Sequence, residues 1–145
     1  MADSSFLCST GKKGGINGKE YTVAEIAARI DHTVLAPDAV RQDIEKACTQ
    51  ARSYRFKAVF TNPYWTQLVA ELLDGSGVAA GISIAFPLGA VPSRAKALEV
   101  EDTLNRAEGK LCAVDMATNI SLLKEQRYER LYRGCPGCFR TCRRH

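Results

Sequence analysis

The chain has no long hydrophobic run. Nowhere in its 145 residues does it approach the roughly 18 consecutive apolar residues that a membrane-spanning helix requires. Residues 1–15 also lack the apolar core and the leading positive charge of a secretory signal peptide. These absences argue against a membrane or secreted protein, and we expect a cytoplasmic one. With 46% hydrophobic and 25% charged residues, the composition is that of one ordinary globular domain.

Most of the chain also lacks a disulfide framework and any excess of positive charge. Cys8, Cys48 and Cys112 are scattered singly, which is typical of buried or free thiols in a reducing compartment. Residues 1–126 carry 14 basic and 15 acidic side chains, whereas residues 127–145 carry six Arg and one acid. The net charge of +4 therefore comes from the C-terminal residues alone, and we do not expect a nucleic-acid-binding body.

Residues 131–145 have no apolar periodicity and hold the crowded cysteines. The pattern Cys135-x2-Cys138-x3-Cys142-x2-His145 offers four soft ligands, the number that a structural zinc site needs. Its spacing fits no common zinc finger, because two ligand pairs are usually separated by a longer linker. We therefore expect an unrelated Cys/Arg-rich tail without a metal. Zinc binding, and an RNA or phosphate contact through the arginines, stay open as alternatives.

Residues 1–20 are polar, rich in glycine and without periodicity, and we expect them to form a flexible leader. The following residues alternate between helical and strand patterns. Helix caps are predicted at Thr22, Asp38, Asn62 and Ser93, since side chains of these types accept hydrogen bonds from the first amides of a helix. Four strands are predicted, at residues 30–35, 57–61, 78–86 and 111–117.

The predicted strands are almost continuously apolar, which is typical of parallel strands that are covered on both faces. A strand-helix unit that repeats every 25 to 30 residues predicts right-handed βαβ crossovers and an α/β fold. Both a doubly wound open sheet and a (β/α)8 barrel fit this pattern. Four strands cannot close a parallel barrel, which needs eight strands and about 200 to 250 residues. If the fold is a barrel, half of it is missing from these residues.

Five segments within residues 22–130 carry a more specific pattern. They are Ile30-Asp-His-Thr-Val-Leu-Ala-Pro-Asp-Ala39, Phe56-Lys-Ala-Val-Phe-Thr-Asn-Pro-Tyr64, Ala70-Glu-Leu-Leu-Asp-Gly-Ser-Gly-Val78, Ile84-Ala-Phe-Pro-Leu-Gly-Ala90 and Val114-Asp-Met-Ala-Thr-Asn-Ile-Ser-Leu-Leu-Lys124. In this order they resemble the deoxyribose-phosphate aldolase family. The resemblance implies the N-terminal portion, about four strand-helix units with parallel strands, of a (β/α)8 TIM barrel. This aldolase-type part would span residues 21–130.

The resemblance implies a lyase of deoxyribonucleotide catabolism, a class I aldolase. Such enzymes cleave 2-deoxyribose 5-phosphate to acetaldehyde and glyceraldehyde 3-phosphate without a metal or an organic cofactor. A lysine forms a Schiff base with the substrate, and a carboxylate-water relay moves the protons. The family's lysine lies in a sixth-strand K-T-S-T-G-F motif, and neither this motif nor the phosphate-binding loops of the later strands occur here. The resemblance therefore implies a truncated chain that is inactive alone.

The resemblance also assigns site residues. Asp115, at the end of the fourth strand, matches the carboxylate of the proton relay, since barrel chemistry lies at the C-terminal ends of the strands. Asp31 and Thr33 match a polar pair at the exit of the first strand that binds the substrate or the lysine pair. Asn62 and Asn119 are expected to line the pocket. Judged without the resemblance, Asp115 and Asp31 are also consistent with a cap or loop carboxylate that binds backbone amides.

Two further expectations concern the fourth strand. One residue more than the usual family spacing separates Gly109 from Asp115, which leaves the register of this strand open. An open four-stranded parallel sheet also exposes its edges and one apolar side, which favours a homo-oligomer, aggregation or partial unfolding. A non-catalytic half-barrel that pairs with another chain through its open edge is therefore an alternative function.

Overall fold

The structure, a computed structural model, describes residues 14–16 and 19–130 of the chain. Its elements are β1 (Gly14–Ile16), β2 (Lys19–Tyr21), α1 (Val23–Ala27), β3 (Asp31–Val34), α2 (Arg41–Tyr54), β4 (Ala58–Thr61), the 3-10 turn η2 (Pro63–Trp65), α3 (Thr66–Leu73), β5 (Ala79–Ile84), α4 (Ser93–Arg106), β6 (Leu111–Met116) and α5 (Ile120–Lys124). The later four strands form one parallel sheet in the order β3-β4-β5-β6. Parallel strands that alternate with helices were predicted, and each strand lies within its predicted range.

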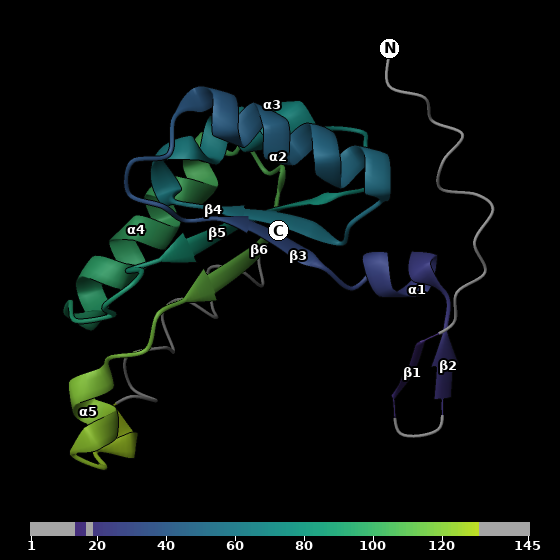
Figure 1. The fold of residues 1–145 in the computed structure, drawn as a ribbon. Coiled ribbons are helices and arrows are strands. Elements are labelled where there is room, and N and C mark those ends of the chain that lie inside the picture. Colours follow the sequence, from purple (N-terminus) through teal and green to yellow (C-terminus); the bar gives the residue numbers. More distant parts are fainter. Residues whose placement is uncertain (1–13, 17–18, 131–145) are drawn as a thin grey trace.

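Helices α2, α3 and α4 pack on the same face of this sheet (Figure 1). Every second residue of a strand points toward them, because the side chains of a strand alternate between its two faces. The fully buried aliphatic side chains of this covered face are Ile44, Val59, Val69, Ile82, Ile84 and Val100. Together they form the hydrophobic core, which lies between the sheet and the helices.

The helix caps agree only in part with the predicted ones. Thr22 caps α1 as predicted: its hydroxyl accepts from the Glu25 amide, and the Glu25 carboxylate accepts from the Thr22 amide. The cap predicted at Asp38 is wrong, because Asp38 lies in a turn and α2 begins three residues later. Asp43 instead accepts from the amide of Val40, 2.9 Å away, and so binds the amide of the residue that precedes this helix.

Asn62 is the N-cap residue as predicted, with Pro63 at the first position of the 3-10 turn η2, but its side chain makes no capping bond and donates instead to the Ala36 carbonyl oxygen. The cap predicted at Ser93 is wrong. Ser93 is the first helical residue of α4 rather than its cap, since Pro92 holds the extended backbone that precedes the helix. Proline fixes this conformation without a side-chain hydrogen bond. The predicted helices exist, but their first turns are set by the backbone of the loops.

Strands β5 and β6 pair with one irregularity. Ala80 pairs with Leu111 but Gly81 pairs with Ala113, so Cys112 is an extra residue in β6 that faces no partner of its own. This is a β-bulge, in which two residues of one strand oppose one residue of the other. The bulge absorbs the additional residue between Gly109 and Asp115. Beyond it the pairing is regular, and Ser83 lies beside Asp115.

The N-terminal leader contains regular structure that the sequence did not predict. Strands β1 and β2 pair antiparallel, with Gly14 opposite Tyr21 and Ile16 opposite Lys19. Paired backbone groups stabilise such a ribbon without the apolar periodicity on which the prediction relied. The remaining leader residues and the whole tail, residues 131–145, lie outside the described part of the chain. No helix within the described part is long and apolar enough to cross a membrane.

Candidate active site

The face of the sheet opposite the helices carries the residues that the sequence singled out. On β3, His32 bonds Gln50 of α2 at 3.1 Å, so its neighbours in the strand point away from the helices. The strand pairing then places the following residues on one surface, which we call the open face: Asp31, Thr33, Ala58, Phe60, Ala79, Gly81, Ser83, Ala113 and Asp115. No described helix packs on this face (Figure 1).

Asp115 lies near the C-terminal end of β6, between two residues that face the core. Val114 and Met116 pack against the cluster around Ile82, Ile84 and Val100, which fixes the strand and directs the Asp115 side chain to the open face. The carboxylate is exposed, and its Oδ1 accepts from the amide of Met116 at 2.9 Å. Most of its acceptor capacity is therefore directed to solvent, where it can exchange protons with water or with a ligand.

Asp31 occupies a different place from the one expected. It is the first residue of β3 and so lies at the N-terminal end of the strand rather than at its exit. Its carboxylate forms an ion pair with Lys57, 3.2 Å away, and both side chains are largely exposed. Thr33 is two residues further along, and its hydroxyl donates to the Asp31 carbonyl oxygen at 3.0 Å.

Asp31 and Asp115 are not brought together in this sheet. Asp31 pairs with Ala58, which pairs with Ala79, whereas Asp115 pairs with Ser83. Ala79 and Ser83 are four residues apart, which is about 13 Å along a strand. The two carboxylates also lie on the two outer strands of the sheet. They could act on one ligand only if the sheet curves around it.

The two asparagines lie nearer to Asp115, at the ends of their strands. Asn62 follows β4, and its side-chain amide donates to the Ala36 carbonyl oxygen at 3.4 Å, which links the exits of β4 and β3. Asn119 caps α5, because its Oδ1 accepts from the amides of Ser121 and Leu122. Both side chains therefore stabilise loops at the edge where the strands end, and Asn119 does so by capping α5.

Lys96 is a residue at this edge that sequence reasoning missed. It belongs to α4, only 7% of its surface is exposed, and its ammonium donates to the Ala117 carbonyl oxygen at 2.7 Å, just beyond the end of β6. Lys96, Val100 and Thr103 are the buried residues of α4, at helical spacing. The signal that could have revealed it is this spacing, which places a lysine on the face that the helix turns to the sheet.

Cys48 belongs to the core, and His32 is a partly buried residue at its edge. Cys48 is buried in α2, and burial raises the pKa of its thiol to about 11, although the charge of Arg52 opposes this effect. A thiol with so high a pKa is a poor nucleophile near neutral pH. The His32 ring packs against Phe56, with ring centroids 5.4 Å apart. Among the described residues no group of His, Cys, Asp and Glu is arranged to hold a metal.

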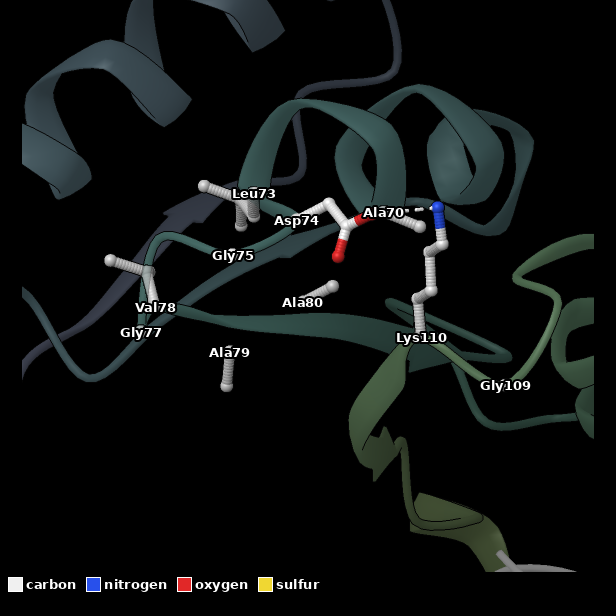
Figure 2. Close-up of a pocket in the computed structure, with 10 residues that line it drawn as sticks. All are labelled: Ala70, Leu73, Asp74, Gly75, Gly77, Val78, Ala79, Ala80, Gly109 and Lys110. Carbon is white, nitrogen blue, oxygen red and sulfur yellow. Dashed lines mark ion pairs between the residues drawn. The ribbon is translucent and has the colours of Figure 1, made fainter.

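A hollow of about 460 Å³ lies at the opposite end of the strands (Figure 2). The residues that line it are Ala70, Leu73, Asp74, Gly75, Gly77, Val78, Ala79, Ala80, Gly109 and Lys110. Lys110 reaches across it to Asp74 at 2.9 Å (Figure 2). A hydrogen bond and the charge of Lys110 lower the pKa of Asp74, and the same contacts raise the pKa of Lys110. This satisfied ion pair lies far from Asp115 and marks a structural contact.

Deoxyribose-phosphate aldolases are among the known proteins that this chain resembles. The chain is 40% identical over 105 residues to the deoxyribose-phosphate aldolase of Clostridium tetani, a match of 72% of this chain and 47% of the relative. It is 44% identical over 102 residues to deoxyribose-phosphate aldolase 1 of Bacillus licheniformis, covering 70% of this chain and 44% of that protein. No protein-family model matches.

The fold gives the same result. The tetrameric deoxyribose phosphate aldolase from Aeropyrum pernix superposes with a TM-score of 0.73 at 28% identity, over 84% of this chain and 49% of that chain. The four parallel strands and their helices therefore match half of an aldolase TIM barrel, as the resemblance implied. The chain spans less than half the length of the curated relatives it matches.

Proposed function

Because the chain belongs to the deoxyribose-phosphate aldolase family, we propose that it is the N-terminal half-barrel of a class I aldolase that cleaves 2-deoxyribose 5-phosphate. By half-barrel we mean strands β3 to β6 with helices α2 to α4. The observation that carries the proposal is Asp115, an exposed carboxylate on the open face of the strand that matches the family's fourth. The half-barrel alone is inactive in this proposal, since it lacks the lysine of the chemistry.

Asp115 acts in the proposed reaction as the carboxylate of the proton relay. When an amine attacks the substrate carbonyl, a carbon-nitrogen bond forms and water leaves, and each step needs a proton moved to or from oxygen. Asp115 can perform this transfer through water, because among residues 14–16 and 19–130 only the Met116 amide donates to its oxygens. Thr33 lies on the same face, and Asn62 and Asn119 are proposed to shape the pocket at the ends of the strands. Asp31 lies at the other end of its strand, beside Lys57, and is not proposed to bind the same ligand as Asp115.

None of the described lysines is placed to form the Schiff base beside Asp115. Lys57 pairs with Asp31 at the far end of the strands, and Lys96 is buried on the helix side of the sheet. Lys110 pairs with Asp74 near the N-terminal end of β6. The remaining described lysines, Lys19, Lys46 and Lys124, lie on β2, α2 and α5. The amine of the reaction is therefore proposed to come from the half of the barrel that this chain does not match.

Borohydride trapping tests the proposal. The purified chain is incubated with acetaldehyde or 2-deoxyribose 5-phosphate, reduced, and analysed by intact mass and peptide mapping. We expect no site-specific lysine adduct on the chain alone. When the unmatched part of the Bacillus licheniformis aldolase is added, we expect an adduct on that part and cleavage of the sugar phosphate. An adduct at one lysine of this chain alone would contradict the proposal that the half-barrel is inactive on its own.

Asp115→Asn provides the matched variant in the assembled enzyme. The amide preserves the shape and the bond from Met116 but cannot accept a proton, so we expect turnover to fall by at least about a hundredfold. Ser83→Ala, on the neighbouring strand of the same face, is the control and should retain activity within a few fold. Equal loss in both variants would mean that the face is damaged as a whole and that Asp115 is no proton relay.

A second candidate is a half-barrel that binds a partner without catalysis. It is favoured by the two outer strands, β3 and β6, neither of which pairs with another described strand on its outer side. Such edges are templates for association. Size-exclusion chromatography with light scattering should then show self-association at micromolar concentration, whereas a compact stable monomer contradicts it. The tail lies outside the described residues, so the zinc- or RNA-binding alternative is tested separately. A zinc-binding tail should bind one equivalent of zinc, and Cys138→Ser should abolish that binding.

The proposal includes a cytoplasmic location and a phosphorylated sugar as the small-molecule partner. The location is supported by Cys48, a free buried thiol of the kind that persists in a reducing compartment. The substrate class rests on the similarity to deoxyribose-phosphate aldolases. No membrane and no nucleic acid take part in it.

A further inference from the structure

Helix α4 reaches the exit of β6 with a buried cation. The Lys96 ammonium donates to the Ala117 carbonyl oxygen at 2.7 Å, two residues beyond Asp115, and its side chain is nine-tenths buried. Within the described part of the chain, this carbonyl oxygen accepts from the ammonium, and no carboxylate forms an ion pair with it. The bond therefore joins the first turns of the helix directly to the end of the strand that carries Asp115.

The next residue on the same side of α4 holds the neighbouring strand. The Glu99 carboxylate accepts from the amide of Ala85 at 3.0 Å, just beyond β5. Ala85 has a φ of 55°, in the left-handed region that is unfavourable for a residue with a Cβ. Such a conformation persists only where its surroundings fix it, and the charged acceptor of Glu99 does so. One helix thus fixes both strand exits, one with a cation and the other with an anion.

The two exits are also joined to each other. The Ala117 amide donates to the Ile84 carbonyl oxygen at 2.9 Å, and the Gly89 amide donates to the Ala85 carbonyl oxygen at 2.8 Å. A Cβ at Gly89 would lie 2.2 Å from the Thr118 carbonyl oxygen, so only glycine allows this approach of the two backbones. The loop after β5 therefore packs on the residues that follow Asp115.

A buried lysine is energetically unfavourable at the position that Lys96 occupies. Burial of an ammonium costs free energy that a single carbonyl bond only partly returns, whereas methionine would fill the same volume without that cost. What the ammonium adds is its bond to Ala117. This is the contribution expected of a group that fixes geometry rather than one that only adds stability.

We propose that Lys96 and Glu99 are positioning residues that fix the exits of β6 and β5 and thereby hold the Asp115 carboxylate at the end of its strand. The inference rests on the proposed function insofar as Asp115 is the reacting carboxylate. Neither residue touches substrate: both lie on the helix side of the sheet, while Asp115 faces the other side. Their effect passes through Ala117, Ala85 and the backbone of β6.

Hydrogen exchange on the full chain tests the positioning without any need for activity. We expect Lys96→Met to speed exchange of the Ala117 amide by about tenfold or more relative to amides in α2, because its bond to Ile84 opens locally. The amide proton of Met116, which reports its bond to the Asp115 carboxylate, should shift in the same variant. Lys46→Met, an exposed lysine of α2, is the control and should change neither signal.

The conservative variants separate positioning from general stability. Lys96→Arg keeps a charged donor and should restore the Ala117 exchange rate to within about threefold of the original chain. Glu99→Gln keeps an acceptor for Ala85 and should have a smaller effect at β5 only. If Lys96→Met speeds exchange in α2 and at Ala117 equally, or if Lys96→Arg rescues nothing, Lys96 has no positioning role.

Kinetics of the assembled enzyme give the second readout. Displacement of the carboxylate should lower kcat about tenfold to a hundredfold and leave KM within about twofold. A change of KM alone would overturn the inference. If the original chain gives no activity in any assembly, the proposed function fails, while the exchange experiment still decides whether Lys96 holds the exit of β6.

Discussion

The two faces of the sheet are built from different side chains. Along β5, the residues toward the helices are Ala80, Ile82 and Ile84, whereas the residues on the open face are Ala79, Gly81 and Ser83. Large branched side chains fill one face, and small side chains with the carboxylate of Asp115 occupy the other. Stability is therefore concentrated on the covered face, and the residues suited to chemistry on the open one.

The small open face has a consequence for what can cover it. Barrel interiors are filled mainly by bulky branched side chains in layers. Apart from Phe60, the open face offers alanines, glycine, serine, threonine and two carboxylates. Two copies of this half-barrel would place small residues opposite small ones and carboxylates opposite carboxylates. A covering half with longer and basic side chains complements it better than a second copy does.

The largest contrast is expected from single truncations on the two faces of β5. Ile82 is fully buried, so Ile82→Ala should lower the free energy of unfolding by about 2 to 5 kcal/mol. Ser83 on the open face is also buried, but Ser83→Ala removes a single oxygen and no branched side chain, so it should change the free energy of unfolding by only about 1 kcal/mol. Urea denaturation followed by circular dichroism measures both. Similar losses would mean that the open face is packed as tightly as the core.

The thiol of Cys48 tests how well the covered face excludes water. Burial raises its pKa from 9.0 to about 11, and in the unfolded chain the value returns to the ordinary one. Between these values the unfolded state loses the proton first, so stability is complete below pH 9 and falls as the pH rises toward 11. The loss should approach about 2 to 3 kcal/mol.

Urea midpoints at pH 8, 9, 10 and 10.5 measure this dependence. Cys48→Ala should show a shallower decline over the same interval, because the titrating thiol is gone. A thiol introduced on the open face by Ala79→Cys should add no decline of its own, since water reaches it in both states. If Cys48→Ala leaves the decline unchanged, water enters the covered face.

A smaller effect on stability is expected at Gly81, where the open face leaves no space for a larger side chain, and this effect should change sign when Phe60 is removed. A Cβ at Gly81 would lie 2.8 Å from the ring of Phe60, which packs over it from β4. Gly81→Ala should therefore cost about 1 to 3 kcal/mol. In a Phe60→Ala background the same change should instead stabilise by about 0.5 to 1 kcal/mol, because alanine loses less entropy than glycine. A double-mutant cycle without coupling would show that the ring does not rest on Gly81.

The sequence was sufficient for the fold, because the apolar periods of strands and helices are local. It failed where a backbone loop decides the outcome. Asp38 and Ser93 have the right chemistry for a cap, yet the turn before α2 and Pro92 before α4 place the helix starts elsewhere. The ribbon of β1 and β2 has no apolar periodicity, so the hydrophobic pattern did not predict it. The Asn17-Gly18 pair between those strands is a strong hairpin signal.

For the candidate site, the sequence predicted which residues to consider but not where all of them lie. The resemblance selected Asp115, and the strand pattern placed it at the end of β6. The predicted strand over residues 30–35 already placed Asp31 near its start, so the assignment of Asp31 to the strand exit came from the resemblance and not from the strand pattern. Lys96 was missed because its importance lies in a bond to a backbone carbonyl 21 residues away. The only sequence signal of such a contact is the position of the lysine on the buried face of its helix.

The smallest effect is expected at the ion pair that belongs to neither face, Asp74 with Lys110. The pair lowers the pKa of Asp74, so its contribution is present above the ordinary pKa of an aspartate and is lost as the pH falls through the lowered value. Both side chains are substantially exposed, and such pairs contribute little to stability. Lys110→Met should therefore lower the melting temperature only slightly at pH 7, and by less as the pH falls through the lowered pKa of Asp74. The difference at pH 7 should also vanish in 1 M salt, because the pair is screened. A loss of stability as large as that of Ile82→Ala would mean that the hollow beside the pair is part of the core. Stability would then not be concentrated on the covered face alone.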